Sequence, residues 1–65
     1  MIRVLIVDND QFFRQSLAYL INASEGLEVV GECSDGSEVA SAVGELRPDV
    51  VVMDLRMGAM SGLRR

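Results

Sequence analysis

Three short runs of apolar residues divide the chain into segments of different character. Residues 2–7 and 49–53 are mostly apolar, and each run ends directly at an aspartate, Asp8 or Asp54. Runs of this length are too short to span a membrane and are typical of strands buried on both faces, as in a parallel sheet. The middle run, residues 27–33, alternates apolar with polar positions and contains two glutamates, which fits the edge of a sheet.

The two segments between these runs have the periodicity of amphipathic helices. The first helix is expected over residues 11–23, with Asp10 as its N-cap and Gly26 as a left-handed residue after its end. The second is expected over residues 38–47 and is stopped by Pro48. The stripes that carry these predictions are Phe13, Leu17, Leu20 and Ile21 in the first helix, and Val39, Ala42, Val43 and Leu46 in the second.

The order strand–helix–strand–helix–strand, with short links, predicts an α/β fold with a parallel sheet. Right-handed crossovers and a polar middle strand at the edge give the strand order 2-1-3, with one helix on each face. Strict alternation in the middle strand predicts one shared face for Leu27, Val29, Gly31 and Cys33. The first and third strands then meet at a topological switch point, where ligands bind in open α/β sheets, and Asp8 and Asp54 lie at its lip.

The third strand, in this arrangement, is a hydrophobic edge, and a single helix leaves much of each sheet face bare. Exposed edges of this kind promote pairing with other chains. We therefore expect residues 1–65 to be a single unit that corresponds to the first half of a larger doubly wound domain. Self-association through the open edge of the third strand, residues 50–53, is a further expectation.

Composition narrows the function classes. The chain has 65 residues and a net charge of −4, and all six basic residues are Arg, without the basic patch that nucleic-acid binding needs. A lone cysteine, Cys33, cannot form an internal disulfide, and no apolar stretch is long enough for a membrane helix, so we expect a cytoplasmic protein without a membrane partner. The absence of histidine excludes His-ligated zinc and a Ser-His-Asp triad within the chain.

The carboxylates at the lip suit two kinds of chemistry, binding of a hard cation or acid–base catalysis. Mg²⁺ typically takes one or two carboxylates together with waters and phosphate oxygens, and Asp8, Asn9 and Asp54 offer suitable oxygens. A carboxylate beside Mg²⁺ can also attack a phosphoryl group. Asp8 alone is explained as a turn residue, whereas Asp54, directly after an apolar strand, has no comparable structural explanation.

Five segments in order resemble one known family: IRVLIVD (2–8), VVGE (29–32), DG (35–36), LRPDVVVMD (46–54) and MSG (60–62). Together they look like the receiver domain of bacterial two-component response regulators, and the match extends over the whole chain. It is closest to regulators of the NarL/LuxR type, which carry a C-terminal helix-turn-helix.

The resemblance implies a flavodoxin-like (CheY-like) fold, of which this chain is the part with strand order 2-1-3. It implies that Asp54 accepts a phosphoryl group from a sensor histidine kinase, and that Asp8, Asn9, Asp54 and the backbone carbonyl of Arg56 hold Mg²⁺. Such a module is a phosphoryl acceptor and not an enzyme, with at most Mg²⁺-dependent self-phosphorylation and dephosphorylation. It would control transcription, and bind DNA, only through a C-terminal output domain.

Three departures from the family pattern bear on function. Asn9 stands where an Asp or Glu is usual, which should weaken Mg²⁺ binding, and Asp10 could compensate only by giving up its role as a helix cap. Gly58-Ala59 stands where Pro-Gly is usual, which should loosen the loop after Asp54. The chain also stops after the third strand, before the family's switch Ser/Thr and its phosphate-contacting Lys.

These departures keep a rival function open, that of an interaction module without phosphotransfer. Phosphorylation of Asp54 separates the two hypotheses. A third class, Mg²⁺-dependent phosphatases with an aspartate nucleophile, would want a second acid two residues further on, where this chain has Arg56.

Overall fold

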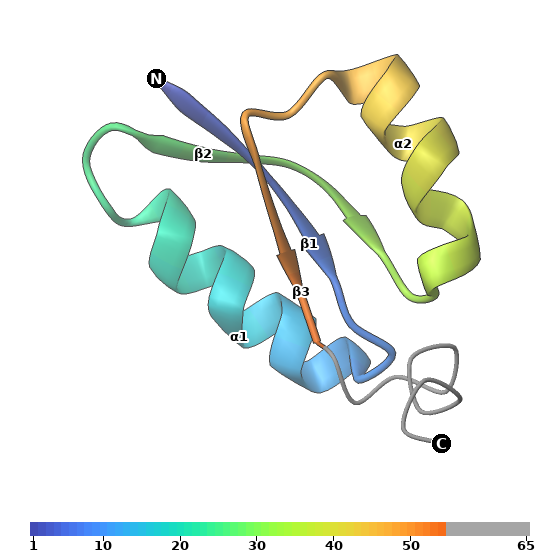
Figure 1. Ribbon diagram of the computed structural model, residues 1–65. Coiled ribbons are helices and arrows are strands. Elements are labelled where there is room, and N and C mark those ends of the chain that lie inside the picture. The colour runs from blue at the N-terminus through green and yellow to red at the C-terminus, as the bar shows by residue number, and fades with distance from the viewer. Residues whose placement is uncertain (55–65) are drawn as a thin grey trace.

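The computed structural model describes residues 1–54, in which strands and helices alternate (Figure 1). The elements are β1 (Ile2–Val7), α1 (Gln11–Asn22), β2 (Leu27–Cys33), the 3₁₀ helix η1 (Gly36–Glu38), α2 (Val39–Leu46) and β3 (Val50–Met53). Strand β1 pairs in parallel with both β2 and β3, so the order is β2-β1-β3. The predicted α/β class, parallel sheet and 2-1-3 order are confirmed. The predictions for Arg56 and for Gly58-Ala59 lie outside the described residues.

Helix α1 begins and ends where local chemistry predicts. The side chain of Asp10 accepts a hydrogen bond from the backbone N–H of Phe13 at 3.2 Å, which satisfies one of the amides left free at a helix start. The helix ends with Ala23 as its C-cap, and Gly26 then adopts a φ of +86°, a conformation that only glycine adopts without strain. Both predicted ends are therefore confirmed to within one residue.

Helix α2 is shorter than predicted because a 3₁₀ turn precedes it. Asp35 caps that turn by accepting from the N–H of Ser37 at 3.3 Å, and the α-helix begins only at Val39. At the other end Arg47 leaves right-handed helical geometry, with a φ of 51° and a ψ of 60°, immediately before Pro48.

Strand β2 contains an irregularity that the alternation of its sequence does not reveal. Val4 of β1 pairs with Val29, but Leu5 pairs with Gly31, so Val30 is an extra residue opposite β1. An extra residue of this kind changes which face the following side chains take. The odd-numbered residues of β2 consequently lie on one face of the sheet before Val30 and on the opposite face after it.

The second half of β2 faces α2. A Cβ atom added to Gly31 would lie 2.5 Å from Cδ1 of Leu46, so the helix packs directly over this glycine. Cys33 joins the same cluster with Leu5 and Val7 of β1. The prediction of one face shared by Leu27, Val29, Gly31 and Cys33 is therefore wrong, because the register shift divides the set after Val29.

The core is centred on β1, and the two helices lie on opposite sides of the sheet (Figure 1). The buried apolar residues of the described chain are Val4, Leu5, Ile6 and Val7 from β1 and Cys33 from β2, and of these Leu5, Ile6 and Val7 are fully buried. Neither α1 nor α2 contributes a fully buried residue. The fold thus rests on one central strand, with helices that cover it only in part.

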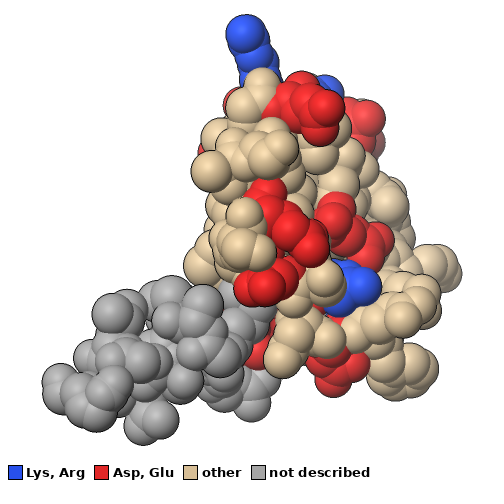
Figure 2. All heavy atoms as spheres, turned by 90° about the vertical axis from the view of Figure 1, so that its right-hand side faces the viewer, with Lys and Arg blue, Asp and Glu red and all other residues tan. Residues whose placement is uncertain are grey.

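The surface of residues 1–54 is acidic. All ten Asp and Glu residues of the chain lie in this part, together with three of its six Arg. Figure 2 shows acidic side chains gathered over one face, with few basic ones among them. Among the helices of this region, none has the length and apolar character needed to cross a bilayer.

Candidate functional site at the carboxyl end of the sheet

Strands β1 and β3 bring Asp8 and Asp54 to the same edge of the sheet. Val7 pairs with Met53, so the residues that follow are neighbours across the two strands. The backbone N–H of Asp54 donates to the carbonyl of Val7 at 3.1 Å and continues the ladder to this point. Asp8 and Asp54 both line a hollow of about 220 Å³, so the predicted juxtaposition is present.

The walls of this hollow are apolar apart from the two carboxylates. The lining residues are Ile6, Val7, Asp8, Phe13, Leu17, Val52, Met53 and Asp54. No Arg is among them, so within residues 1–54 no cationic side chain lines the space between the two acids. Two carboxylates in a largely apolar hollow suit a hard cation such as Mg²⁺, which needs only one or two carboxylates besides waters and phosphate oxygens. Residues 1–54 contain no group of three or more His, Cys, Asp or Glu that could hold a metal ion.

Asp8 is the more enclosed of the two acids, with 3% of its surface exposed. Its backbone N–H donates to the carbonyl of Cys33 at 3.0 Å, and its Oδ1 accepts from the N–H of Asp10 at 2.8 Å. Burial of an ionised carboxylate is costly unless it is hydrogen-bonded or paired with a cation. The local structure therefore supplies part of that compensation and orients the carboxylate.

Asn9 and Asp10, which follow Asp8 in the loop after β1, are not among the residues that line the hollow. Asn9 is exposed and is not one of the lining residues. Asp10 uses its carboxylate to cap α1, as its bond to Phe13 shows, so it does not compensate for the missing charge at Asn9. Of the predicted ligands in the described residues, the structure therefore brings together Asp8 and Asp54 and leaves Asn9 on the loop surface.

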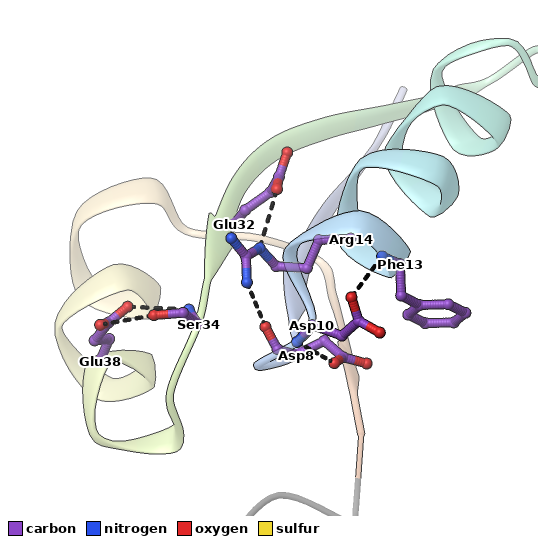
Figure 3. A network of polar contacts seen from close by, with 7 residues as sticks. All are labelled: Asp8, Asp10, Phe13, Arg14, Glu32, Ser34 and Glu38. Carbon is purple, nitrogen blue, oxygen red and sulfur yellow. Dashed lines mark hydrogen bonds and ion pairs between the residues drawn. The ribbon is translucent and has the colours of Figure 1, made fainter.

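Arg14 is a site residue that the sequence predictions did not include. Its Nη1 donates to the carbonyl of Asp8 at 2.6 Å, and its Nε pairs with Oε1 of Glu32 at 3.2 Å (Figure 3). One side chain of α1 thus joins the loop after β1 to strand β2. A signal was present, because Arg14 is the single charged residue in the segment 11–22.

Cys33 lies beside this loop, and its environment disfavours the thiolate. Burial of the thiol raises its pKa above the ordinary value of 9.0, and the negative charge of Glu38 raises it further, while Arg14 acts in the opposite direction. The predicted role of Cys33 as a small buried apolar residue agrees with its 4% exposure.

We expect the Cys33 thiol to react much more slowly with iodoacetamide in the native chain than in urea, since only the thiolate is nucleophilic. The raised pKa also means that the folded state keeps its proton where the unfolded state loses it. This contribution to stability is therefore present below pH 9.0 and is lost as the pH rises above it. Denaturant titrations across this range, with Cys33→Ala as the comparison, measure the effect. An equally steep loss of stability in Cys33→Ala would assign it to other groups.

A family model for the response regulator receiver domain matches residues 4–65. This chain belongs to the receiver domain family. The match covers all of the parallel sheet except the first two residues of β1, together with the two acids at its edge, and it confirms the resemblance seen in the sequence motifs. Receiver domains are modules of two-component signalling, are generally not enzymes, usually interact with sensor histidine kinases and generally bind Mg²⁺ at an acidic pocket.

Curated relatives of the receiver domain carry different functional names. This chain is 48% identical over 63 residues to the transcriptional regulatory protein LiaR of Bacillus subtilis, and the alignment covers 97% of this chain and 30% of LiaR. It is 44% identical over 63 residues to the transcriptional regulatory protein BtsR of Salmonella typhi, covering 97% of this chain and 26% of BtsR. A protein-glutamate methylesterase/protein-glutamine glutaminase of Photobacterium profundum is 42% identical over 62 residues, covering 95% of this chain and 16% of that protein.

The receiver domain thus spans less than a third of the length of each of these three relatives. Two of them are named as transcriptional regulators, which is the output that the NarL/LuxR resemblance implied, and the third is named as an enzyme. The common element among them is the region matched by this chain. The matched region supports a role in two-component signalling, but it does not identify the process that the signal controls.

Proposed function

We propose that this receiver domain accepts a phosphoryl group on Asp54 from a sensor histidine kinase. The observation that carries the proposal is that Asp8 and Asp54 line one hollow at the carboxyl end of two neighbouring parallel strands. A pair of acids in such a place favours a cation between them, and the cation in turn favours the approach of a phosphoryl group. Asp54 is the acceptor in this proposal because it is only half-buried, whereas Asp8 is 3% exposed and its carboxylate already accepts from the N–H of Asp10.

In the proposed transfer, a carboxylate oxygen of Asp54 attacks phosphorus in line with the leaving group. The bond from phosphorus to the histidine nitrogen breaks, its electron pair stays on that nitrogen, and an acyl phosphate forms on Asp54. The bond from the Asp54 N–H to the carbonyl of Val7 fixes the main chain of the nucleophile. Asp8, Asp54 and the backbone carbonyl of Arg56 would hold Mg²⁺, which Asn9 would reach only by turning in from the loop surface, and the metal would neutralise the phosphoryl oxygens.

The output belongs to the same proposal. The names of LiaR and BtsR, both transcriptional regulatory proteins, favour control of transcription. DNA would be bound only through a C-terminal output domain, as the family resemblance implies. We place the protein in the cytoplasm as part of this signalling pathway.

The test is the intact mass of the chain after incubation with Mg²⁺ and acetyl phosphate, a small acyl-phosphate donor. We expect one phosphoryl adduct, which does not form when EDTA removes the metal before the donor is added. A parallel sample joins the LiaR segment that follows the matched region to residue 65, so that the sheet can be completed. An adduct in this chimera alone would show that the site works but needs the rest of the domain. The absence of an adduct from both samples would favour the rival function, an interaction module without phosphotransfer.

Replacing Asn9 with Asp should strengthen Mg²⁺ binding about tenfold. The carboxylate is on the loop beside Asp8 and can turn toward the metal, and a charge about 4 Å from a cation is worth about 1 kcal/mol or more even in water. Calorimetric titration with MgCl₂ measures the affinity. Asn22→Asp is the matched control, because it makes the same change of charge at the far end of α1, where Asn22 accepts from the N–H of Val29 at 3.0 Å. An equal gain in both variants would assign the effect to net charge and not to ligation.

A further inference from the structure

We infer that Arg14 is a positioning residue for the metal and phosphoryl site, acting on the main chain of Asp8 with Glu32 as its anchor. The inference rests on the proposed function for the identity of that site. It concerns a side chain that does not line the hollow and that would touch neither metal nor phosphoryl group. Its basis is the way in which Arg14 holds the loop that carries the predicted ligands.

The guanidinium of Arg14 makes two contacts with different parts of the fold (Figure 3). Its Nη1 donates to the carbonyl of Asp8 at 2.6 Å, and its Nε donates to Oε1 of Glu32 on β2 at 3.2 Å. Only 14% of the Arg14 side chain is exposed, against 35% for Glu32, so the bond to Asp8 lies in the more protected part of the contact. Charge-assisted bonds from a rigid, planar group hold geometry better than neutral bonds from a flexible one.

The carbonyl of Asp8 is the point at which β1 ends and the loop begins. The N–H of Asp8 is held by Cys33 and its carboxylate by the N–H of Asp10, but its carbonyl is held by the side chain of Arg14. The peptide group that contains this carbonyl also contains the N–H of Asn9. Fixing its orientation therefore fixes the path of the loop from Asp8 through Asn9 to Asp10, whose N–H binds the Asp8 carboxylate. Without Arg14 this peptide can rotate, and the carboxylate of Asp8 then loses the bond from the N–H of Asp10 that orients it.

The direction in which the Mg²⁺ affinity changes when Arg14 is removed distinguishes a positioning role from a purely electrostatic one. Arg14 is a positive charge close to a cation site, so its removal would strengthen Mg²⁺ binding if charge alone mattered. A positioning role predicts the opposite, a weaker affinity, because the ligand oxygens lose their alignment. Glu32→Gln should also weaken binding, since it frees Arg14 from its anchor and leaves its charge uncompensated beside Asp8.

The test compares Arg14→Met with the parent chain in titrations with MgCl₂ alone. Outer-shell partners of metal ligands typically contribute tenfold or more to affinity, so we expect Arg14→Met to bind Mg²⁺ about tenfold more weakly. Arg14→Lys, which keeps the charge but has a single donor group, should be intermediate. The matched control is Arg3→Met: Arg3 donates to the carbonyls of Leu46 and Arg47 at the opposite end of the sheet. It should lower stability without changing the Mg²⁺ affinity.

Unchanged or tighter binding in Arg14→Met, or equal weakening in Arg3→Met, would overturn the inference. A second measurement needs no metal and no phosphoryl donor: hydrogen exchange of the Asp10 amide, which donates to Asp8 Oδ1. Exchange should become faster in Arg14→Met and not in Arg3→Met, and unchanged protection would overturn the inference even if the parent binds no Mg²⁺. Hydrogen exchange therefore tests the positioning role of Arg14 separately from the proposed function, which metal binding and phosphorylation test. If a variant does not fold in the 65-residue chain, the same comparison is made in the LiaR chimera.

Discussion

Replacing Asp54 with Asn is expected to abolish the phosphoryl adduct completely. The amide is nearly the same size as the carboxylate, but it is neutral and a very poor nucleophile, so the acyl phosphate cannot form. The main-chain bond from residue 54 to the carbonyl of Val7 does not involve the side chain and should persist. Intact mass after incubation with Mg²⁺ and acetyl phosphate measures the adduct, and far-ultraviolet circular dichroism confirms that the fold is kept.

The chain offers a matched control in Asp49→Asn. Asp49 precedes β3 at the other end of the strand, where its Oδ2 accepts from the N–H of Arg3 at 2.9 Å. This variant undergoes the same change of charge and should form the adduct at the level of the parent. Persistence of the adduct in Asp54→Asn would mean that another group accepts the phosphoryl. Loss of the adduct in both variants would point to unfolding and not to the acceptor.

The 65-residue chain by itself is expected to self-associate, or to melt without a cooperative transition, because its sheet has an open hydrophobic edge. Val50, Val51 and Val52 of β3 are 45%, 38% and 37% exposed, and within residues 1–54 this strand pairs only with β1. Such edges favour pairing with another chain, and a chain of this length buries only about 60% of its unfolded surface. Sedimentation over a range of concentrations, together with thermal unfolding, measures both properties.

A charge on the edge should reduce this association. We expect Val51→Lys to weaken it by about tenfold or more, corresponding to roughly 1.4 kcal/mol, because two paired edges would bring two lysines together. Val43→Lys is the control, since Val43 lies on α2 with the same 38% exposure but away from the sheet edge. A cooperative melt of a monomer, independent of concentration, would contradict the prediction. Equal effects of both lysines would assign the association to general hydrophobic contact.

Much of the fold follows from local signals in the sequence. The apolar runs that end at Asp8 and Asp54, the capping position of Asp10 and the left-handed Gly26 each act within a few residues of the chain, and the structure contains all of them. The strand order then follows from the handedness of crossovers and the polarity of the middle strand. The meeting of Asp8 with Asp54 was therefore predictable, since neighbouring parallel strands end at the same edge.

Other features depend on how distant segments fit together. The extra residue Val30 arises where β2 must adjust to β1, and no local pattern marks it. The exposure of Asn9 follows from the loop path that Arg14 and Asp10 impose. The pairing of Arg14 with Glu32 joins residues 18 positions apart, so it could be seen only once β2 lay beside the start of α1.

By itself, then, the sequence determined the α/β class, the strand order, the helix ends and the pair of acids at the sheet edge, because short-range sterics and hydrophobic periodicity decide these. Only the tertiary structure decided which side chains face the hollow, which face the second half of β2 takes, and what holds the loop after Asp8. These depend on contacts between segments far apart in the chain, whose geometry is settled jointly when the sheet and its helices pack.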